Sequence, residues 1–192
     1  IDNEHLSLLN KHFDQATEAG RISRFVPASG AASRMFKPLY GDAALFAACR
    51  PEEPSAAASP EEEALRQFCA ELPRFAFYPD LLQTMAEAGL DLEQAMRQRD
   101  LEPIVRTLLE PSGLGYANLP KGLLAFHQEV DGARTPFIEH LAEAALLNGS
   151  DGVARVHFTV SPDHLPLFEA QLMAWQKTLT LSYGCHFDVT YS

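Results

Sequence analysis

The chain has 192 residues, of which 46% are hydrophobic, and this is enough for one domain with a sizeable core. Its formal net charge of −11 disfavours nucleic acid and anionic membranes as partners, and no apolar run is long enough for a membrane helix. Three scattered cysteines lack metal-site spacing and an even count, so we expect reduced thiols in a cytoplasmic protein, with no zinc site and no disulfide framework.

The first predicted elements are a helix and a strand. Apolar residues recur with a helical period over residues 4–19, which predicts a helix with Asn3 as its cap and Gly20 as its end. Residues 22–28 are predicted to form a strand, and we expect a short helix to begin near Ala32.

A turn of small residues follows this strand, and two cations, Arg34 and Lys37, follow the turn. A strand that feeds such a turn exposes backbone N–H groups at the edge where α/β sheets bind phosphates. Arg34 can offer a fork of donors to phosphate oxygens. The alternative is a plain strand-to-helix connection, in which small residues serve only tight packing. The turn consists of Ala28, Ser29, Gly30, Ala31, Ala32 and Ser33.

The middle of the chain, residues 42–112, is predicted to be an all-helical insertion. Proline and small residues dominate residues 50–60, which predicts a linker. Ser59 and Pro60, followed by three glutamates, are typical of a helix start, and this helix is expected to run to Leu72. Further helical patterns cover residues 80–88, 91–99 and 102–110.

An α/β pattern follows the insertion, with predicted strands over residues 123–127, 153–160 and 185–191. One helix is predicted over residues 136–148, with its start at Thr135 and Pro136 and its stop at Gly149. A second helix is predicted from the cap Ser161 to Leu179. Strands separated by helices imply a parallel sheet. Because the last predicted strand reaches Ser192, we expect the natural protein to continue beyond it.

Lys121 lies between Pro120 and Gly122, at the entry to the strand predicted over residues 123–127. Its ammonium group could reach into a cleft and anchor a phosphate. The alternative is an ordinary solvated loop lysine.

Four segments, in the same order along the chain, resemble the sugar nucleotidyltransferases, which are also called nucleoside-diphospho-sugar pyrophosphorylases. Residues 28–35 resemble the family's glycine-rich signature loop, and residues 120–124 resemble its Pro-Lys segment. Residues 135–141 resemble the family's Pro-Leu-Ile-Glu-His helix start, and residues 158–164 resemble the strand and turn that come next. The whole chain also resembles an uncharacterised bacterial family, known only as a domain of unknown function, built on this pattern.

The predicted elements indicate a single α/β domain over residues 1–192 with an inserted helical lobe, which the resemblance does not cover. The resemblance implies a Rossmann-like parallel sheet. It also implies a reaction in which a sugar 1-phosphate attacks the α-phosphate of a nucleoside triphosphate and pyrophosphate leaves, assisted by Mg²⁺. By position, the backbone of residues 28–33 would line the triphosphate, Arg34 would stabilise the charge on pyrophosphate, and Lys121 would hold a substrate phosphate. Lys37 is near enough in sequence to assist.

Three departures from the family pattern leave other functions open. Ser29 and Ala32 replace glycines, and their Cβ atoms narrow the approach to the backbone and disfavour positive φ. The insertion separates Arg34 from Lys121 by 87 positions. The family's metal-binding aspartate would lie beyond Ser192, so we expect no metal ligand in this chain and no activity from it alone. The alternatives are a catalytically idle binding or regulatory module on the same fold, and a scaffold whose helical lobe contacts a partner protein.

Overall fold

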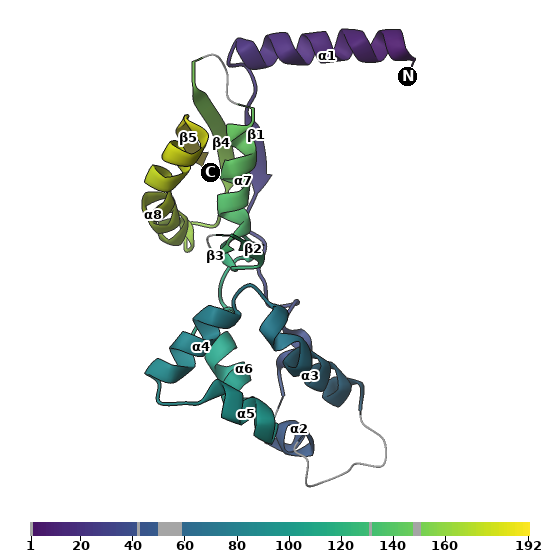
Figure 1. The fold of residues 1–192 in the computed structure, drawn as a ribbon, viewed down its shortest axis with the longest axis vertical. Coiled ribbons are helices and arrows are strands. Elements are labelled where there is room, and N and C mark those ends of the chain that lie inside the picture. The colour runs from purple at the N-terminus through teal and green to yellow at the C-terminus, as the bar shows by residue number, and fades with distance from the viewer. Residues whose placement is uncertain (1, 42, 50–58, 131, 148–150) are drawn as a thin grey trace. The chain divides into compact units, whose positions relative to one another are not determined.

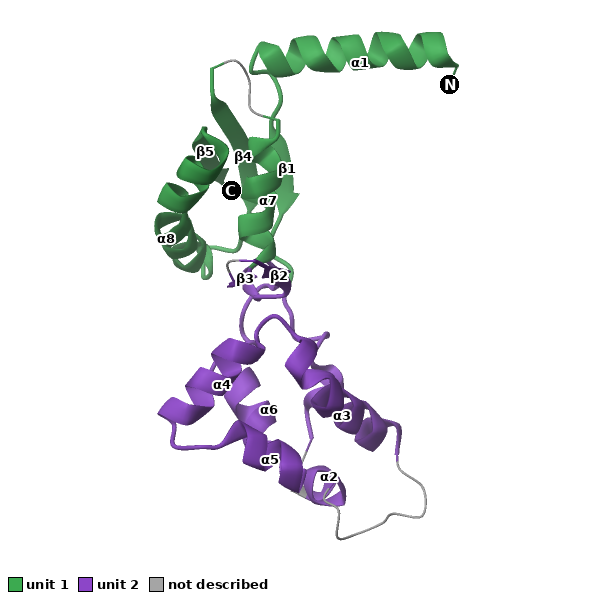
Figure 2. Cartoon of the chain, in the orientation of Figure 1, with its two compact units in different colours: residues 1–30, 135–192 green, residues 31–134 purple. Residues whose placement is uncertain are grey.

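The protein is α/β, with a three-stranded parallel sheet flanked by helices. The computed structural model describes residues 2–41, 43–49, 59–130, 132–147 and 151–192. The chain divides into two compact units (Figure 2). Unit 1 contains residues 1–30 and 135–192, and unit 2 contains residues 31–134.

The sheet belongs to unit 1, and its strand order is β1 (Arg24–Pro27), β4 (Val153–Thr159) and β5 (His186–Tyr191). Both pairs of neighbours are parallel, with Arg24 opposite Val156 and Val153 opposite His186. Parallel neighbours require a crossover connection, and helix α8 (Leu165–Tyr183) provides it between β4 and β5. The strands predicted around residues 22–28, 153–160 and 185–191 are therefore confirmed.

The core of unit 1 lies between the sheet and the helices α7 (Pro136–Ala145) and α8, which Figure 1 shows beside the strands. Alternate residues of β4, ending at Phe158, are buried. The ring of Phe158 lies 4.7 Å from that of Phe137 on α7, and Phe137 lies 5.2 Å from Phe168 on α8, measured between ring centroids. All three rings are fully buried, so they join both helices to the sheet.

The starts of α7 and α8 differ in how well local sequence predicts them. Helix α7 begins at Pro136 as predicted, and Thr135 caps it, because its hydroxyl accepts a hydrogen bond from the Ile138 N–H at 3.4 Å. Helix α8 begins at Leu165, so the predicted start at Ser161 is wrong. The Ser161 hydroxyl bonds Nδ1 of His164 at 2.8 Å, and the intervening residues form a turn. The stop predicted at Gly149 lies outside the described residues.

Helix α1 (Asn3–Glu18) opens the chain, and none of its residues is buried. Asp2, rather than the predicted Asn3, is its cap, because the Asp2 carboxylate accepts a hydrogen bond from the His5 N–H at 2.9 Å. The helix ends just before Gly20, whose φ of +65° is a conformation that glycine adopts readily.

Unit 2 is built mainly from helices. They are α2 (Ala43–Ala48), α3 (Pro60–Glu71), α4 (Tyr78–Glu87), α5 (Leu92–Gln98) and α6 (Leu101–Leu109), with the short 3₁₀ helices η1 (Lys37–Leu39), η2 (Leu72–Arg74) and η3 (Lys121–Leu123). Helices α2 to α6 fall within the insertion predicted over residues 42–112. Ser59 caps α3 as predicted, since its hydroxyl accepts the Glu62 N–H at 3.1 Å. Most of the predicted linker, residues 50–58, lies outside the described residues.

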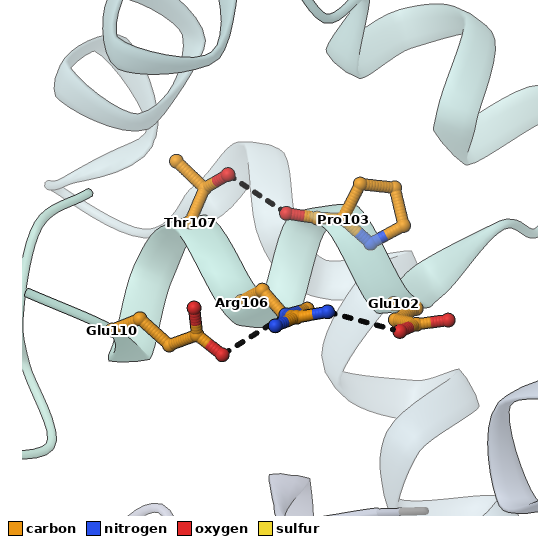
Figure 3. Close-up of polar contacts among 5 residues, drawn as sticks. All are labelled: Glu102, Pro103, Arg106, Thr107 and Glu110. Carbon is orange, nitrogen blue, oxygen red and sulfur yellow. Dashed lines mark hydrogen bonds and ion pairs between the residues drawn. The ribbon is translucent and has the colours of Figure 1, made fainter. Parts of the chain in front are cut away.

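Helix α6 occupies the centre of unit 2, with six of its nine residues buried. Its one buried hydroxyl, on Thr107, donates to the backbone oxygen of Pro103 at 2.8 Å, as Figure 3 shows. On the solvent side, Arg106 pairs with Glu110 at 2.9 Å and with Glu102 at 3.4 Å. The helix therefore buries an apolar face whose only hydroxyl is satisfied within the helix.

The strand predicted over residues 123–127 is wrong. Residues 121–123 form η3, and a short antiparallel hairpin of β2 (His127–Glu129) and β3 (Gly132–Arg134) follows it. The Leu123 N–H donates to the Pro120 oxygen at 2.9 Å, which closes a tight turn. Leu124 is fully buried in the core of unit 2, so its apolar character reflects burial in a helical core. Short apolar runs do not distinguish these two environments.

Candidate phosphate-binding site

The first half of the predicted phosphate loop, residues 28–30, directly follows β1. Ala28 is buried, and its N–H donates to the Thr159 oxygen of β4 at 2.8 Å, whereas Ser29 and Gly30 are exposed. A Cβ atom added to Gly30 would meet nothing within 4 Å, and its φ lies outside the left-handed region. The fold therefore does not require glycine at position 30, and the space above its backbone is open.

The second half of the loop belongs to unit 2, and it pairs with the segment that carries Lys121. Ala31 forms an antiparallel bridge with Pro120, and the Ala32 N–H donates to the Leu119 oxygen at 3.4 Å. Arg34 follows Ala31 by three residues, and Lys121 directly follows Pro120. The structure thus brings together the two cation-bearing segments that are 87 positions apart in the sequence.

The helix predicted to begin near Ala32 is absent from this described segment. Ala32 is fully buried, the Met35 N–H donates to its oxygen at 2.8 Å, and the chain makes a turn before η1 starts at Lys37. The N–H groups of this loop therefore do not form the N-terminus of a helix, so no helix dipole acts there. Positive charge for binding an anion would have to come from side chains. Ser33 and Arg34 are exposed in this turn.

The three cations Arg34, Lys37 and Lys121 are exposed, and within the described part of the chain none of them forms an ion pair. By contrast, Arg97 and Arg106 of the same unit are paired with glutamates. Cations without a protein partner remain available to an anionic ligand.

Ser29 and Ala32, which stand where the sugar nucleotidyltransferases that the chain resembles have glycine, fit the backbone without strain. Among the described residues, Arg99 is the one non-glycine residue with positive φ, so neither Ser29 nor Ala32 has a left-handed backbone. The expected conformational penalty does not arise. The N–H of Ala32 is already used by Leu119, however, so this group of the loop is not free to bind a phosphate.

Magnesium, implied by the family resemblance, has no evident ligands in these two segments. Residues 31–37 and 120–121 contain no carboxylate, and Mg²⁺ prefers oxygen ligands. In the residues that the structure describes, no group of three or more His, Cys, Asp or Glu side chains could hold a metal ion. We therefore assign no magnesium ligand and derive no step through the metal.

Sequence reasoning missed an apolar pocket of about 610 Å³ that adjoins the loop within unit 2. Met35, Phe36 and two residues of η1 form one part of its lining, and α3, the residues between η2 and α4, and the segment before β2 form the rest. The phenylalanines that line it are Phe36, Phe68, Phe75, Phe77 and Phe126. The closely spaced aromatic residues between Phe68 and Phe77 are the local signal for it, but the segments that meet there are far apart in sequence.

The sequence profile of a family described as a domain of unknown function, DUF4301, matches residues 1–192, so the chain belongs to that family. This confirms the resemblance to an uncharacterised family, whereas the nucleotidyltransferase resemblance remains a prediction. No curated protein and no solved structure matches the chain. In the described ranges, none of the helices has both the length and the apolar character needed to cross a membrane.

Proposed function

We propose that this member of the DUF4301 family binds a nucleoside triphosphate through the loop that ends at Arg34 and the segment around Lys121. We further propose that the chain is the nucleotide-binding part of a nucleotidyltransferase-like protein with a Rossmann-like sheet. The observation that supports this most is the bridge between Ala31 and Pro120, because it pairs the two segments that the family resemblance requires to act together.

In the proposed reaction, a sugar 1-phosphate oxygen attacks the α-phosphate of the nucleotide, and the bond to pyrophosphate breaks. The Arg34 guanidinium would donate hydrogen bonds to the pyrophosphate oxygens, where negative charge grows as this bond breaks. The Lys121 ammonium would hold a substrate phosphate as a point charge, and Lys37 would add positive charge next to the loop. Such catalysis consists of positioning and charge stabilisation.

One observation favours a second candidate, a module that binds a nucleotide or sugar phosphate without chemistry. Ala32 stands where the sugar nucleotidyltransferases have glycine. It is fully buried, and its N–H donates to the Leu119 oxygen at 3.4 Å. A loop with fewer free N–H groups offers less stabilisation to a charge that develops during a reaction. Binding through the exposed side chains of Arg34 and Lys121 would remain.

A thermal-shift experiment tests nucleotide binding. The chain is heated with ATP, GTP, CTP or UTP, each with and without Mg²⁺, and the variants Arg34→Ala and Lys121→Ala are measured beside it. A ligand present at about 100 times its dissociation constant stabilises by about 2.7 kcal/mol. For a chain of this size, that raises the melting temperature by roughly 5–10 °C.

The matched control is Arg97→Ala, which removes an exposed arginine of unit 2 that pairs with Glu93 at 3.5 Å. We expect Arg97→Ala to keep the shift and both test variants to lose most of it. No shift with any nucleotide, or an equal shift in Arg34→Ala, would refute the proposed site. If nucleotide binds, an assay of pyrophosphate release with sugar 1-phosphates separates the enzyme from the idle module.

A further inference from the structure

The apolar pocket of unit 2 is an exposed continuation of an aromatic core. Phe77, which is 1% exposed, stacks on Phe75 with ring centroids 5.1 Å apart and planes 11° apart. Phe75, which is 36% exposed, in turn lies 5.4 Å from Phe68. The rings therefore pass stepwise from the interior to the pocket surface, and the buried members hold the exposed ones in place.

Another part of the lining comes from the residues that directly follow the loop of the candidate site. Phe36 is buried, and its ring lies 6.0 Å from that of Tyr116 and 6.4 Å from that of Phe126. Its neighbour Met35 also lines the pocket and is 44% exposed. A volume of about 610 Å³ lies within the range typical of small-molecule sites, which are mostly apolar, concave and largely preformed.

Two polar side chains line the pocket, and two cations lie next to its lining residues in sequence. Gln67 and Glu71 of α3 are the polar side chains in its lining, and Glu71 is paired with Arg74. Arg34 and Lys37 directly flank Met35 and Phe36 in sequence, and both are exposed without an ion pair among the described residues. An apolar site whose lining residues Met35 and Phe36 are flanked in sequence by unpaired cations is complementary to a ligand with an apolar body and an anionic end.

We propose that this pocket binds the hydrocarbon body of a phosphate monoester, whose phosphate is held by Arg34 and Lys37. A nucleobase or sugar is a poorer occupant, because its polar edges would need hydrogen-bond partners that two side chains of α3 do not supply. Two cations match the charge of a phosphate better than that of a carboxylate. The inference rests on the proposed phosphate site in one respect, since both use the cations Arg34 and Lys37.

Isothermal titration calorimetry with decyl phosphate, below its micelle concentration, tests this inference. Decanol and inorganic phosphate are the comparison ligands, because each carries one half of the probe. We expect decyl phosphate to bind at least about tenfold more tightly than either, since the pocket and the cations then act on one molecule. Equal affinity for decanol would remove the role assigned to the cations and overturn the proposal.

Substitutions in the pocket and at the two cations test where decyl phosphate binds. Ala64, a half-buried residue of α3, lines the pocket, so Ala64→Trp is expected to fill it and to weaken decyl phosphate binding at least tenfold. The control Ala86→Trp places the same side chain on an exposed position of α4 and is expected to bind normally. If Ala64→Trp fails to fold, Gln67→Trp at an exposed lining position replaces it. The double variant Arg34→Ala/Lys37→Ala is expected to bind decyl phosphate no better than decanol.

The outcomes separate this inference from the proposed function. Binding of decyl phosphate that survives in Ala64→Trp would overturn the pocket assignment, as would no binding to the unaltered chain. If nucleotides shift the melting temperature but decyl phosphate does not bind, only this inference fails. If decyl phosphate binds in an Arg34-dependent manner and no nucleotide does, only the nucleotide proposal fails.

Discussion

Gly113 follows α6, and among the glycines whose surroundings the structure describes it has the closest contact for an added methyl group. A Cβ atom there would lie 2.0 Å from the backbone oxygen of Thr107, and real Cβ atoms are essentially never closer than 3.0 Å to such an atom. The chain would have to move by about 1 Å, because neither contacting group is a flexible side-chain end. The neighbouring hydrogen bond from the Leu114 N–H to the same oxygen, 2.7 Å long, would be strained by that movement.

The expected magnitude of Gly113→Ala follows from these two effects. Overpacking in a well-packed region costs about 1–3 kcal/mol, and a weakened hydrogen bond adds about 1 kcal/mol. We therefore expect a loss of about 2–4 kcal/mol in the free energy of unfolding. This corresponds to a decrease of roughly 4–16 °C in melting temperature for a chain of this size. Far-UV circular dichroism, during heating and during urea titration, measures both quantities.

Two other glycines are matched controls for this substitution. Gly30→Ala is expected to leave stability unchanged or to raise it by up to about 1 kcal/mol, since nothing lies within 4 Å of the added atom and φ is not left-handed. Gly89→Ala also meets nothing within 4 Å, but its φ is +75°, so it is expected to cost about 1–2 kcal/mol. If the free energy of unfolding of Gly113→Ala lies within about 0.5 kcal/mol of that of the unaltered chain, the reasoning from close contact is refuted.

Burial raises the pKa of Tyr116 to about 12 and also raises that of Tyr191 to about 12, whereas an unfolded tyrosine titrates near ~10. As the pH rises, the unfolded chain loses these two protons before the folded chain does. The contribution of the two buried tyrosines to the free energy of unfolding is therefore fully present below pH ~10, and it is lost as the pH rises towards ~12. Urea midpoints across this range should fall less in Tyr116→Phe, and an identical fall would contradict the assignment. Burial also raises the pKa of the Cys69 thiol to about 12 and that of Cys49 above its usual value. These two thiols should react with Ellman's reagent near pH ~8 only after denaturation, and rapid reaction in the folded protein would show that they are accessible.

Elements with strong local signals were predictable from the sequence. Ser59 and Thr135 each precede proline and a helical pattern, and both helices begin there as expected. Ser161 also precedes a proline and a helical pattern, but its hydroxyl bonds the His164 side chain and residues 162–164 form a turn. The sequence pattern does not distinguish such a turn from a helix start. The apolar run around Leu124 predicts a strand, whereas the structure places Leu124 in a helical core, because burial in either environment produces similar short apolar runs.

The candidate site depends on contacts that lie beyond the reach of local pattern. Arg34 and Lys121 were recognisable as cations next to turns, yet only the Ala31–Pro120 bridge joins their segments. The pocket was missed for the same reason, since its wall combines Met35 and Phe36 with rings from about 30 to 90 positions later in the chain. Local propensity does not determine such long-range pairings.

The division of unit 1 into two chain segments has a consequence for how this protein is made. Arg24 of β1 pairs with Val156 of β4, so the first strand of the sheet leaves the ribosome about 130 residues before its partner. At about 5–20 residues per second, synthesis keeps β1 without that partner for roughly 7–26 s. All of unit 2 emerges during this interval and can fold first, which shortens the flexible chain that must close when β4 arrives. The order of synthesis thus places completion of the helical unit before completion of the sheet.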